Sequence, residues 1–212
     1  MKRITLTILL IACGILLPSL TSAQKKGSAE KSRGVPTPLE TYTGTIINMS
    51  GGSLSTGFTL KLEGRTSDDD AQRYRELLAA EGQDDLLKAI HRNDLGFIAA
   101  TGQTRRTLLV VREGLIDGQR RVICAFERWQ NFFELRGGYR STDYPFSIIE
   151  IVFDQKGRGT GTFIGLAQVR MKMDKKTEQM RLELENFGSF PAKIMGVMRR
   201  DRADEVLRVG LR

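Results

Sequence analysis

Residues 58–64 read FTLKLEG, a short stretch in which apolar and polar side chains alternate. Phe58, Leu60 and Leu62 therefore share one face of an extended chain, and the polar residues between them share the other. Residues 179–185, QMRLELE, repeat the alternation. Both stretches are predicted to be strands with one face buried and the other in solvent.

Other stretches are almost continuously apolar, which is typical of strands covered on both faces. They are GFIAA at 96–100, RTLLVV at 106–111, VICAF at 122–126 and SIIEIVF at 147–153. Further strand signals at 42–49, 162–174 and 193–198 bring the prediction to about nine strands. The buried face expected in 162–174 consists of Phe163, Ala167, Val169, Met171 and Met173.

Only the stretch from Ser67 to Asn93 departs from strand periodicity. Ser67 followed by Asp70 resembles a capping box, and three consecutive aspartates suit the positive end of a helix. Apolar residues then recur at helical spacing as far as Gly82, and a second short helix is predicted to end near Asn93. We therefore expect a helical pair between strands two and three.

The predicted fold class is mainly β (α+β), a single antiparallel barrel or sandwich, because both arrangements hide strand edges. The helical pair is expected to cap one end. Turn-forming residues at 50–52, 117–118 and 154–157 fit hairpins. The GRGTG stretch at 157–161 resembles a phosphate-binding loop, but a strand follows it where such a loop requires a helix, so a hairpin is predicted.

The N-terminus has the layout of an export signal. Lys2 and Arg3 precede an apolar run, and small residues end at Ala23. Residues 1–23 are therefore predicted to be a signal peptide, 24–38 a flexible linker, 39–200 the folded domain and 201–212 a C-terminal tail. The stretch LIAC, which ends at Cys13, also resembles a lipoprotein signal. That alternative would anchor the chain to the membrane by lipidation of Cys13.

Export determines how the charge and the cysteines are interpreted. The chain of 212 residues has a formal net charge of +8, but its basic pairs are scattered, and nucleic acid is not expected as a partner of an exported protein. Cleavage after Ala23 would leave Cys124 as the only cysteine, so no intramolecular disulfide is predicted. Apolar neighbours favour a buried, inert thiol at Cys124.

Candidate catalytic groups are few. His91 is the only histidine and falls at a helix C-terminus, and the usual zinc patterns are absent, so no metal site or cofactor is predicted. Glu150 interrupts the apolar run SIIEIVF, and Asp143 lies seven positions earlier. If Glu150 points inward, it is either an acid catalyst with Asp143 as base or a buried partner for an arginine. Because it shares a strand face with Ile148 and Val152, the other alternative is that this face is partly exposed.

Aromatic residues are concentrated between 126 and 146, which holds nearly half of those in the chain. Such a cluster forms either a wall of the core or the rim of an apolar cavity. The candidate ligand-binding residues are Trp129, Phe133, Tyr139 and Tyr144.

The stretches TSDDDAQRYRELLAAEGQDDLLKAI, STDYPFSIIEIVFDQKGRGTGTFIG and LENFG make the chain similar, from about Glu40 to Arg200, to a group of uncharacterised exported bacterial proteins. The resemblance implies a bacterial envelope setting and no particular activity. We expect a periplasmic or extracellular, non-catalytic module that binds an apolar small molecule or an envelope protein. The alternatives are a hydrolase that uses Glu150 and Asp143, and a structural or assembly protein that acts through an exposed strand edge.

Overall fold

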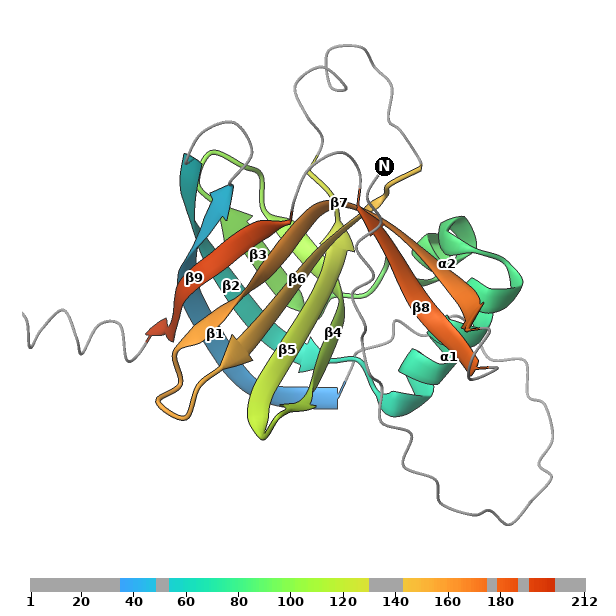
Figure 1. Ribbon diagram of the computed structural model, residues 1–212, viewed down its shortest axis with the longest axis horizontal. Helices are drawn as coiled ribbons and strands as arrows, with labels where there is room; N and C mark the ends of the chain where they lie inside the picture. Colours follow the sequence, from blue (N-terminus) through green and yellow to red (C-terminus); the bar gives the residue numbers. More distant parts are fainter. Residues whose placement is uncertain (1–34, 49–53, 130–142, 175–178, 187–190, 201–212) are drawn as a thin grey trace, which may run out of the picture.

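The computed structural model describes residues 35–48, 54–129, 143–174, 179–186 and 191–200 (Figure 1). Over these residues the chain forms nine strands and two helices. Eight strands close into an antiparallel barrel, and one further strand pairs with a barrel strand that extends beyond the wall. The predicted mainly β class is confirmed, and so is the helical pair between the second and third strands.

The elements follow one another in a simple order. The strands are β1 (Val35–Asn48), β2 (Leu54–Arg65), β3 (Gly96–Ala100), β4 (Arg106–Ile116), β5 (Gln119–Glu127), β6 (Phe146–Phe153), β7 (Gly159–Asp174), β8 (Gln179–Asn186) and β9 (Ala192–Arg199). The helices are α1 (Asp68–Ala80) and α2 (Gln83–Ile90).

The strand pairing decides between the barrel and the sandwich that the sequence left open. Each strand from β1 to β7 pairs antiparallel with the next one. β9 then pairs with both β7 and β1, which closes the barrel. Closure gives each of these eight strands a neighbour on both sides, although β3 and β4 pair at two positions only.

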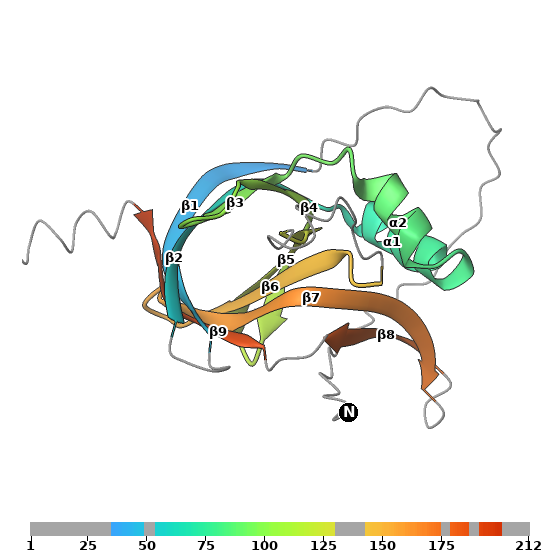
Figure 2. The same cartoon turned by 90° about the horizontal axis from the view of Figure 1, so that it is seen from above.

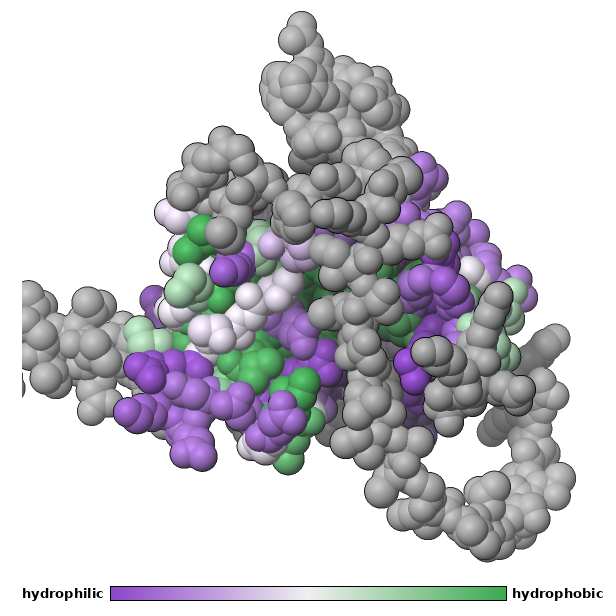
Figure 3. All heavy atoms as spheres, viewed as in Figure 1, coloured by the Kyte–Doolittle hydropathy of each residue, from purple (hydrophilic) through white to green (hydrophobic). Residues whose placement is uncertain are grey.

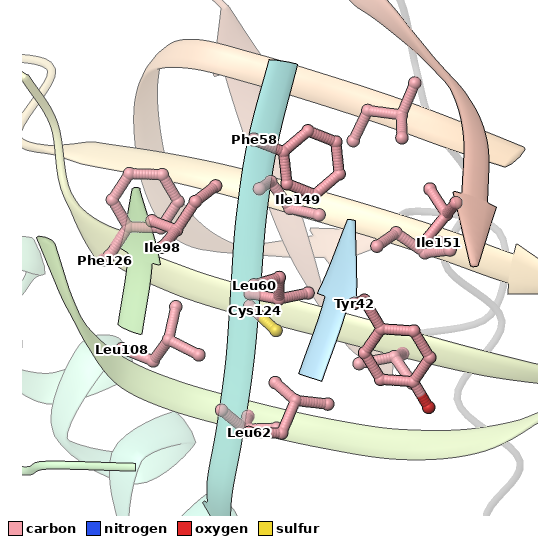
Figure 4. Close-up of a cluster of buried hydrophobic side chains, with 14 of the residues drawn as sticks. Tyr42, Phe58, Leu60, Leu62, Ile98, Leu108, Cys124, Phe126, Ile149 and Ile151 are labelled. Carbon is pink, nitrogen blue, oxygen red and sulfur yellow. The ribbon is translucent and has the colours of Figure 1, made fainter. Parts of the chain in front are cut away.

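Apolar side chains from the strands fill the barrel interior (Figure 4). Leu60, Ile98, Val111 and Ile149 have no solvent exposure at all, so no water-sized void adjoins them. An eight-stranded barrel is about wide enough for side chains to fill it. Around these residues the barrel therefore contains a packed core.

An irregularity in β7 moves its buried face from the inside of the barrel to the outside. Where β6 advances two positions between paired residues, β7 advances three, as in a β-bulge. Phe163 therefore packs against the barrel core, whereas Ala167 and Val169 belong to a second core outside it. The single inward face predicted for 162–174 is wrong for this reason, and Met173 at its end is 51% exposed.

The helices lie against the outer wall of the barrel and not across its end, so the expectation that they cap an end is wrong (Figure 2). The outer faces of β4 and β6 carry apolar side chains such as Leu109 and Ile148, and these have to be covered. The helical side chains that cover them are Tyr74, Leu78, Leu86 and Ile90. Hydrophilic side chains gather on the outward side of the helices, at the right of Figure 3.

The helix boundaries agree with the predicted signals. Ser67 is the N-cap of α1, and its side chain accepts a hydrogen bond from the backbone N–H of Asp70 at 3.0 Å. Gly82 separates the two helices with φ at +88°, a conformation that favours glycine. His91 is the C-cap of α2 and is exposed, as its position in the sequence predicts.

The described chain begins earlier than the predicted domain boundary. β1 starts at Val35, within the stretch assigned to the linker, and Pro36 lies opposite Gly64 of β2. The register shifts between Pro36 and Glu40, because a proline lacks the N–H that a regular ladder requires. The predicted signal peptide at 1–23 and the tail at 201–212 lie outside the described residues.

Candidate binding surface

Trp129, the first of the predicted ligand-binding aromatics, lies at the end of the barrel where β5 finishes. Its indole ring packs edge-on against Phe126, with ring centroids 5.1 Å apart, and against Phe163 at 5.9 Å. The indole Nε1–H donates a hydrogen bond to the carbonyl oxygen of Thr104 at 2.5 Å. Both its apolar surface and its polar atom thus serve the fold, which favours the core-packing interpretation of Trp129.

The other members of the aromatic prediction are not brought together with Trp129 in the described structure. Tyr144 is half-buried and lies two residues before β6. Phe133 and Tyr139 lie outside the described residues, as does the candidate lipidation site Cys13.

Glu150 points to the outer face of β6 and pairs with an arginine. Its carboxylate Oε1 lies 2.5 Å from Nε of Arg121 on β5, and both side chains are largely buried. Asp143 is exposed and lies three residues before β6, where its backbone carbonyl accepts a hydrogen bond from Gln83 at 3.0 Å. The strand between the two carboxylates is at least about 13 Å long, so they do not converge. Glu150 therefore does not point inward, and its partner is an arginine on the outer face of the sheet.

Cys124 is buried in the barrel core. Burial raises the pKa of the Cys124 thiol to about 12, so the thiol stays protonated near neutral pH. Since the thiolate is the nucleophilic form, this geometry supports the inert interpretation.

A network of charged side chains, which we call the barrel-end ion cluster, fills the opposite end of the barrel. It consists of Glu40, Tyr42, Arg65, Glu113 and Arg120. The Oε2 atom of Glu40 lies 2.7 Å from Nη2 of Arg65 and 2.8 Å from Nη2 of Arg120. The Oε2 atom of Glu113 accepts a hydrogen bond from Nε of Arg65 at 3.0 Å, and its Oε1 atom contacts Nε of Arg120. Nη1 of Arg120 donates a hydrogen bond to the Tyr42 hydroxyl at 2.6 Å.

Mutual neutralisation dominates the electrostatics of the barrel-end ion cluster. The hydrogen bond from Arg120 lowers the pKa of Glu113, and Arg65 lowers it further. The pKa of Arg120 is raised, chiefly by its hydrogen bond to Glu113. Burial raises the pKa of Tyr42. The shifts of Glu113 and Arg120 favour their charged forms, so this ion pair is stabilised where the apolar core ends.

Sequence reasoning missed the barrel-end ion cluster, although the period of two contains its signal. Glu40 lies two residues before Tyr42, Glu113 two residues after Val111, and Arg120 two residues before Val122. In each case the charged residue shares a strand face with a core residue. What the sequence lacks is any indication that these strand ends meet.

β7 and β8 form a two-stranded extension of the barrel, here called the β7–β8 ribbon, consisting of residues 167–174 and 179–186. The ribbon leaves the barrel wall and passes beside the helices (Figure 2). β8 pairs with β7 along its whole length and with no other strand of the described chain. Among the described strands, none pairs with the second edge of β8, which lies outside the closed barrel.

One face of the β7–β8 ribbon carries an ion-pair ladder. Arg170 Nε lies 2.5 Å from Oε2 of Glu183, and Lys172 Nζ lies 2.9 Å from Oε1 of the same carboxylate. Arg181 Nη1 lies 2.8 Å from Oδ2 of Asp174. The hydrogen bonds from Lys172 and Arg170 lower the pKa of Glu183. Each charge of this ladder lies close to one of opposite sign.

The other face of the ribbon is apolar. Leu182 and Leu184 are half-buried and pack against the second core together with Met171. Toward the end of the ribbon, Met173 lies opposite Met180. These two methionines are 51% and 46% exposed, so the apolar face continues into solvent beyond the helices.

In comparisons with known proteins, no family model matches the chain, and no curated protein or solved structure is significantly similar to it. Neither helix in the described ranges is long and apolar enough to cross a membrane. Among the same residues, no three histidine, cysteine, aspartate or glutamate side chains group as metal ligands would. The features that the described residues do offer are the edge of β8, the apolar face of the ribbon and the ion pairs.

Proposed function

We propose that the protein is an exported, non-catalytic module of the bacterial envelope that binds a partner protein through the β7–β8 ribbon. The observation that carries the proposal is the edge of β8. Unpaired backbone N–H and C=O groups along a strand recruit a further strand, and proteins use this to bind partners. The exposed Met173 and Met180 beside the edge add flexible apolar contact surface.

The packed barrel core makes a partner protein the better choice of the two ligand classes that the sequence suggested. Ligand-holding barrels keep a cavity open among the inward side chains. Leu60, Ile98 and Ile149 in this barrel have no exposed surface. A small apolar ligand would therefore have to bind elsewhere than beside these core side chains.

The pairing of the ionisable groups supports a non-catalytic role. Glu150 is engaged by Arg121, and Glu113 by Arg65 and Arg120. Acid–base catalysis needs a carboxyl group placed where substrate reaches it, with a pKa near the working pH. The pKa of Glu113 is shifted in the opposite direction.

Site-specific photo-crosslinking tests the proposed function. A photoreactive amino acid replaces Met180 in the full chain, which is produced in a bacterial host and irradiated in the cell. The matched control places the same group at Thr160, an exposed position of β7 within the barrel wall. We expect discrete crosslinked species at Met180 that are missing at Thr160. The same pattern at both positions, or no product at either, would contradict binding through the ribbon.

A further inference from the structure

We propose that the partner that pairs with the β8 edge is a second copy of the same chain, and that the two β8 strands run antiparallel about a twofold axis at Leu182. The proposal rests on the proposed function, since it names the partner of the same edge. It follows from the order of side chains in β8 and from the charges on the ribbon.

The two faces of β8 restrict the possible registers. Leu182 and Leu184 face the apolar side, while Arg181 and Glu183 face the ion-pair ladder. Residues that lie directly opposite in an antiparallel pair have side chains on the same face of the sheet. A twofold axis that passes through a residue keeps apolar faces together, whereas an axis between two residues places the apolar face of one copy beside the charged face of the other.

The charges then select the residue on the axis. With the axis at Leu182, Arg181 of each copy lies opposite Glu183 of the other, so two ion pairs form across the interface. An axis at Arg181 would place that arginine opposite its own copy, and an axis at Glu183 would do the same with two carboxylates. Like charges directly opposite are unfavourable. Of the axes at residues 181, 182 and 183, the axis at Leu182 is therefore the one that places no like charges directly opposite each other.

The same register also brings the apolar side chains of the two copies into contact. Leu182 lies opposite Leu182, and Met180 of each copy lies opposite Leu184 of the other. Met180 is 46% exposed in the single chain, so the pairing covers apolar surface that the fold leaves in solvent.

The charge on the ribbon permits two copies to approach. The ladder face carries three cationic and three anionic side chains, namely Arg170, Lys172, Arg181, Asp174, Glu183 and Glu185. Their formal charges cancel, although the whole chain has a net charge of +8. Long-range repulsion between copies is therefore weakest at a surface such as this one.

A charge swap tests the register. Sedimentation equilibrium of the full chain in mild detergent, at protein concentrations up to about 100 μM, gives the dimer dissociation constant. Arg181→Glu and Glu183→Arg should each weaken the dimer about tenfold or more, because like charges then face each other between copies. The variant with both substitutions should restore it.

The same double variant distinguishes an effect on the interface between copies from an effect on the fold of one chain. Within one chain it places a carboxylate at position 181 beside Asp174 and a guanidinium at position 183 beside Arg170. Inside the ribbon, the contacts with Asp174 and Arg170 are then repulsive, and only the contact of position 181 with Lys172 directly opposite it is attractive. Both contacts between copies are attractive again, so damage to the fold alone predicts less than full rescue of the dimer.

Disulfide trapping gives a second readout. Every variant carries Cys13→Ser, which leaves the buried Cys124 as the other thiol. Leu182→Cys places the two new thiols opposite each other across the axis, within reach of a disulfide. Leu184→Cys is the matched control on the same face, since its two copies would lie about 13 Å apart along the strands.

We expect a dimer with rapid oxidation of Leu182→Cys and little of Leu184→Cys. A monomeric mass over the whole concentration range, equal oxidation of the two cysteine variants, or failure of the double swap to restore the dimer would overturn the proposal. A monomer that still gives specific photo-crosslinks at Met180 to a different protein would overturn the second copy and leave the proposed function standing. If the chain neither dimerises nor gives specific crosslinks at Met180, both the second copy and the proposed function are rejected.

Discussion

The guanidinium Nη2 of Arg120 lies 2.8 Å from Oε2 of Glu40, although the two residues are 80 positions apart. Glu40 is on β1 and Arg120 on β5, and three strands separate β1 from β5 in either direction around the barrel. The ion pair therefore spans the barrel end from opposite walls. Because the chain closes on itself, these charges can partner each other where the apolar core stops.

Loss of Arg120 should destabilise the fold. Arg120→Met keeps much of the side-chain length but leaves Glu40 and Glu113 with Arg65 as their remaining cation in the barrel-end ion cluster. We expect a loss of about 2 kcal/mol in the free energy of unfolding, between the values for exposed and buried ion pairs. Urea unfolding measures it. Arg170→Met, at a side chain that is 45% exposed, should cost less than about 1 kcal/mol. Equal losses would contradict a structural role for the cluster.

The barrel-end ion cluster should make the fold sensitive to acid. Arg120 and Arg65 lower the pKa of Glu113 below its unfolded value, so its contribution to stability is present above that value and is lost as pH falls through the folded pKa. Glu113→Gln should therefore show a smaller loss of unfolding free energy on acidification than the wild-type chain. The measurement is urea unfolding at a series of pH values between about 7 and 3. Parallel curves for the two proteins would show that Glu113 does not carry this dependence.

The Cys124 thiol should be unreactive in the native protein. It is fully buried, and burial raises its pKa to about 12. A thiol reagent at pH 8 should label it only after denaturant is added, at a rate set by unfolding. The folded state holds this proton more tightly than the unfolded state, so the stability it contributes should decrease as pH rises above about 9. Rapid labelling without denaturant would contradict the packed core.

Gly161 should not tolerate a side chain. A Cβ atom there would lie 1.8 Å from the backbone carbonyl oxygen of Glu150 on the adjacent strand, so the ladder between β6 and β7 would have to move. We expect Gly161→Ala to destabilise the protein by about 3 kcal/mol. Gly114→Ala is the control, because no atom lies within 4 Å of its added Cβ. Thermal unfolding of both variants tests the close approach, and similar melting temperatures would contradict it.

Glu150 should contribute to the stability of the fold. Glu150→Gln removes the charge that faces Arg121 in a largely buried pair, so we expect a loss of about 2 kcal/mol. Asp143→Asn, at an exposed side chain, should change the unfolding free energy by less than about 0.5 kcal/mol. Crosslinking at Met180 should survive both substitutions. The rival hydrolase hypothesis predicts instead that Glu150→Gln reduces an enzymatic rate about a hundredfold or more.

Local patterns were sufficient for the number and order of the strands and helices, although β1 begins earlier than predicted. The alternation around Leu60 identified β2, and the cap at Ser67 with the terminating Gly82 delimited α1. The continuous apolar runs of β4, β5 and β6 correctly indicated strands covered on both faces, because the helices lie on their outer side. Such features depend on neighbouring residues alone, so they can be derived from the sequence.

Features that depend on distant residues could not be derived in this way. The aromatic cluster made Trp129 a ligand-binding candidate. The residues around it in the sequence do not show that its Nε1–H donates to the carbonyl oxygen of Thr104. The sequence pattern likewise placed the face of β7 wrongly, since one additional residue between paired positions reverses every side chain that follows.

The sequence by itself determined the strands, the helical pair and the alternation of β8, because hydrophobic period and capping are local properties of the chain. Only the tertiary structure decided that the barrel closes, that Glu40 meets Arg120 across it, and that β7 is the one described strand with which β8 pairs. These depend on which strands pair, and the free energy of pairing comes from contacts between residues that are far apart in sequence.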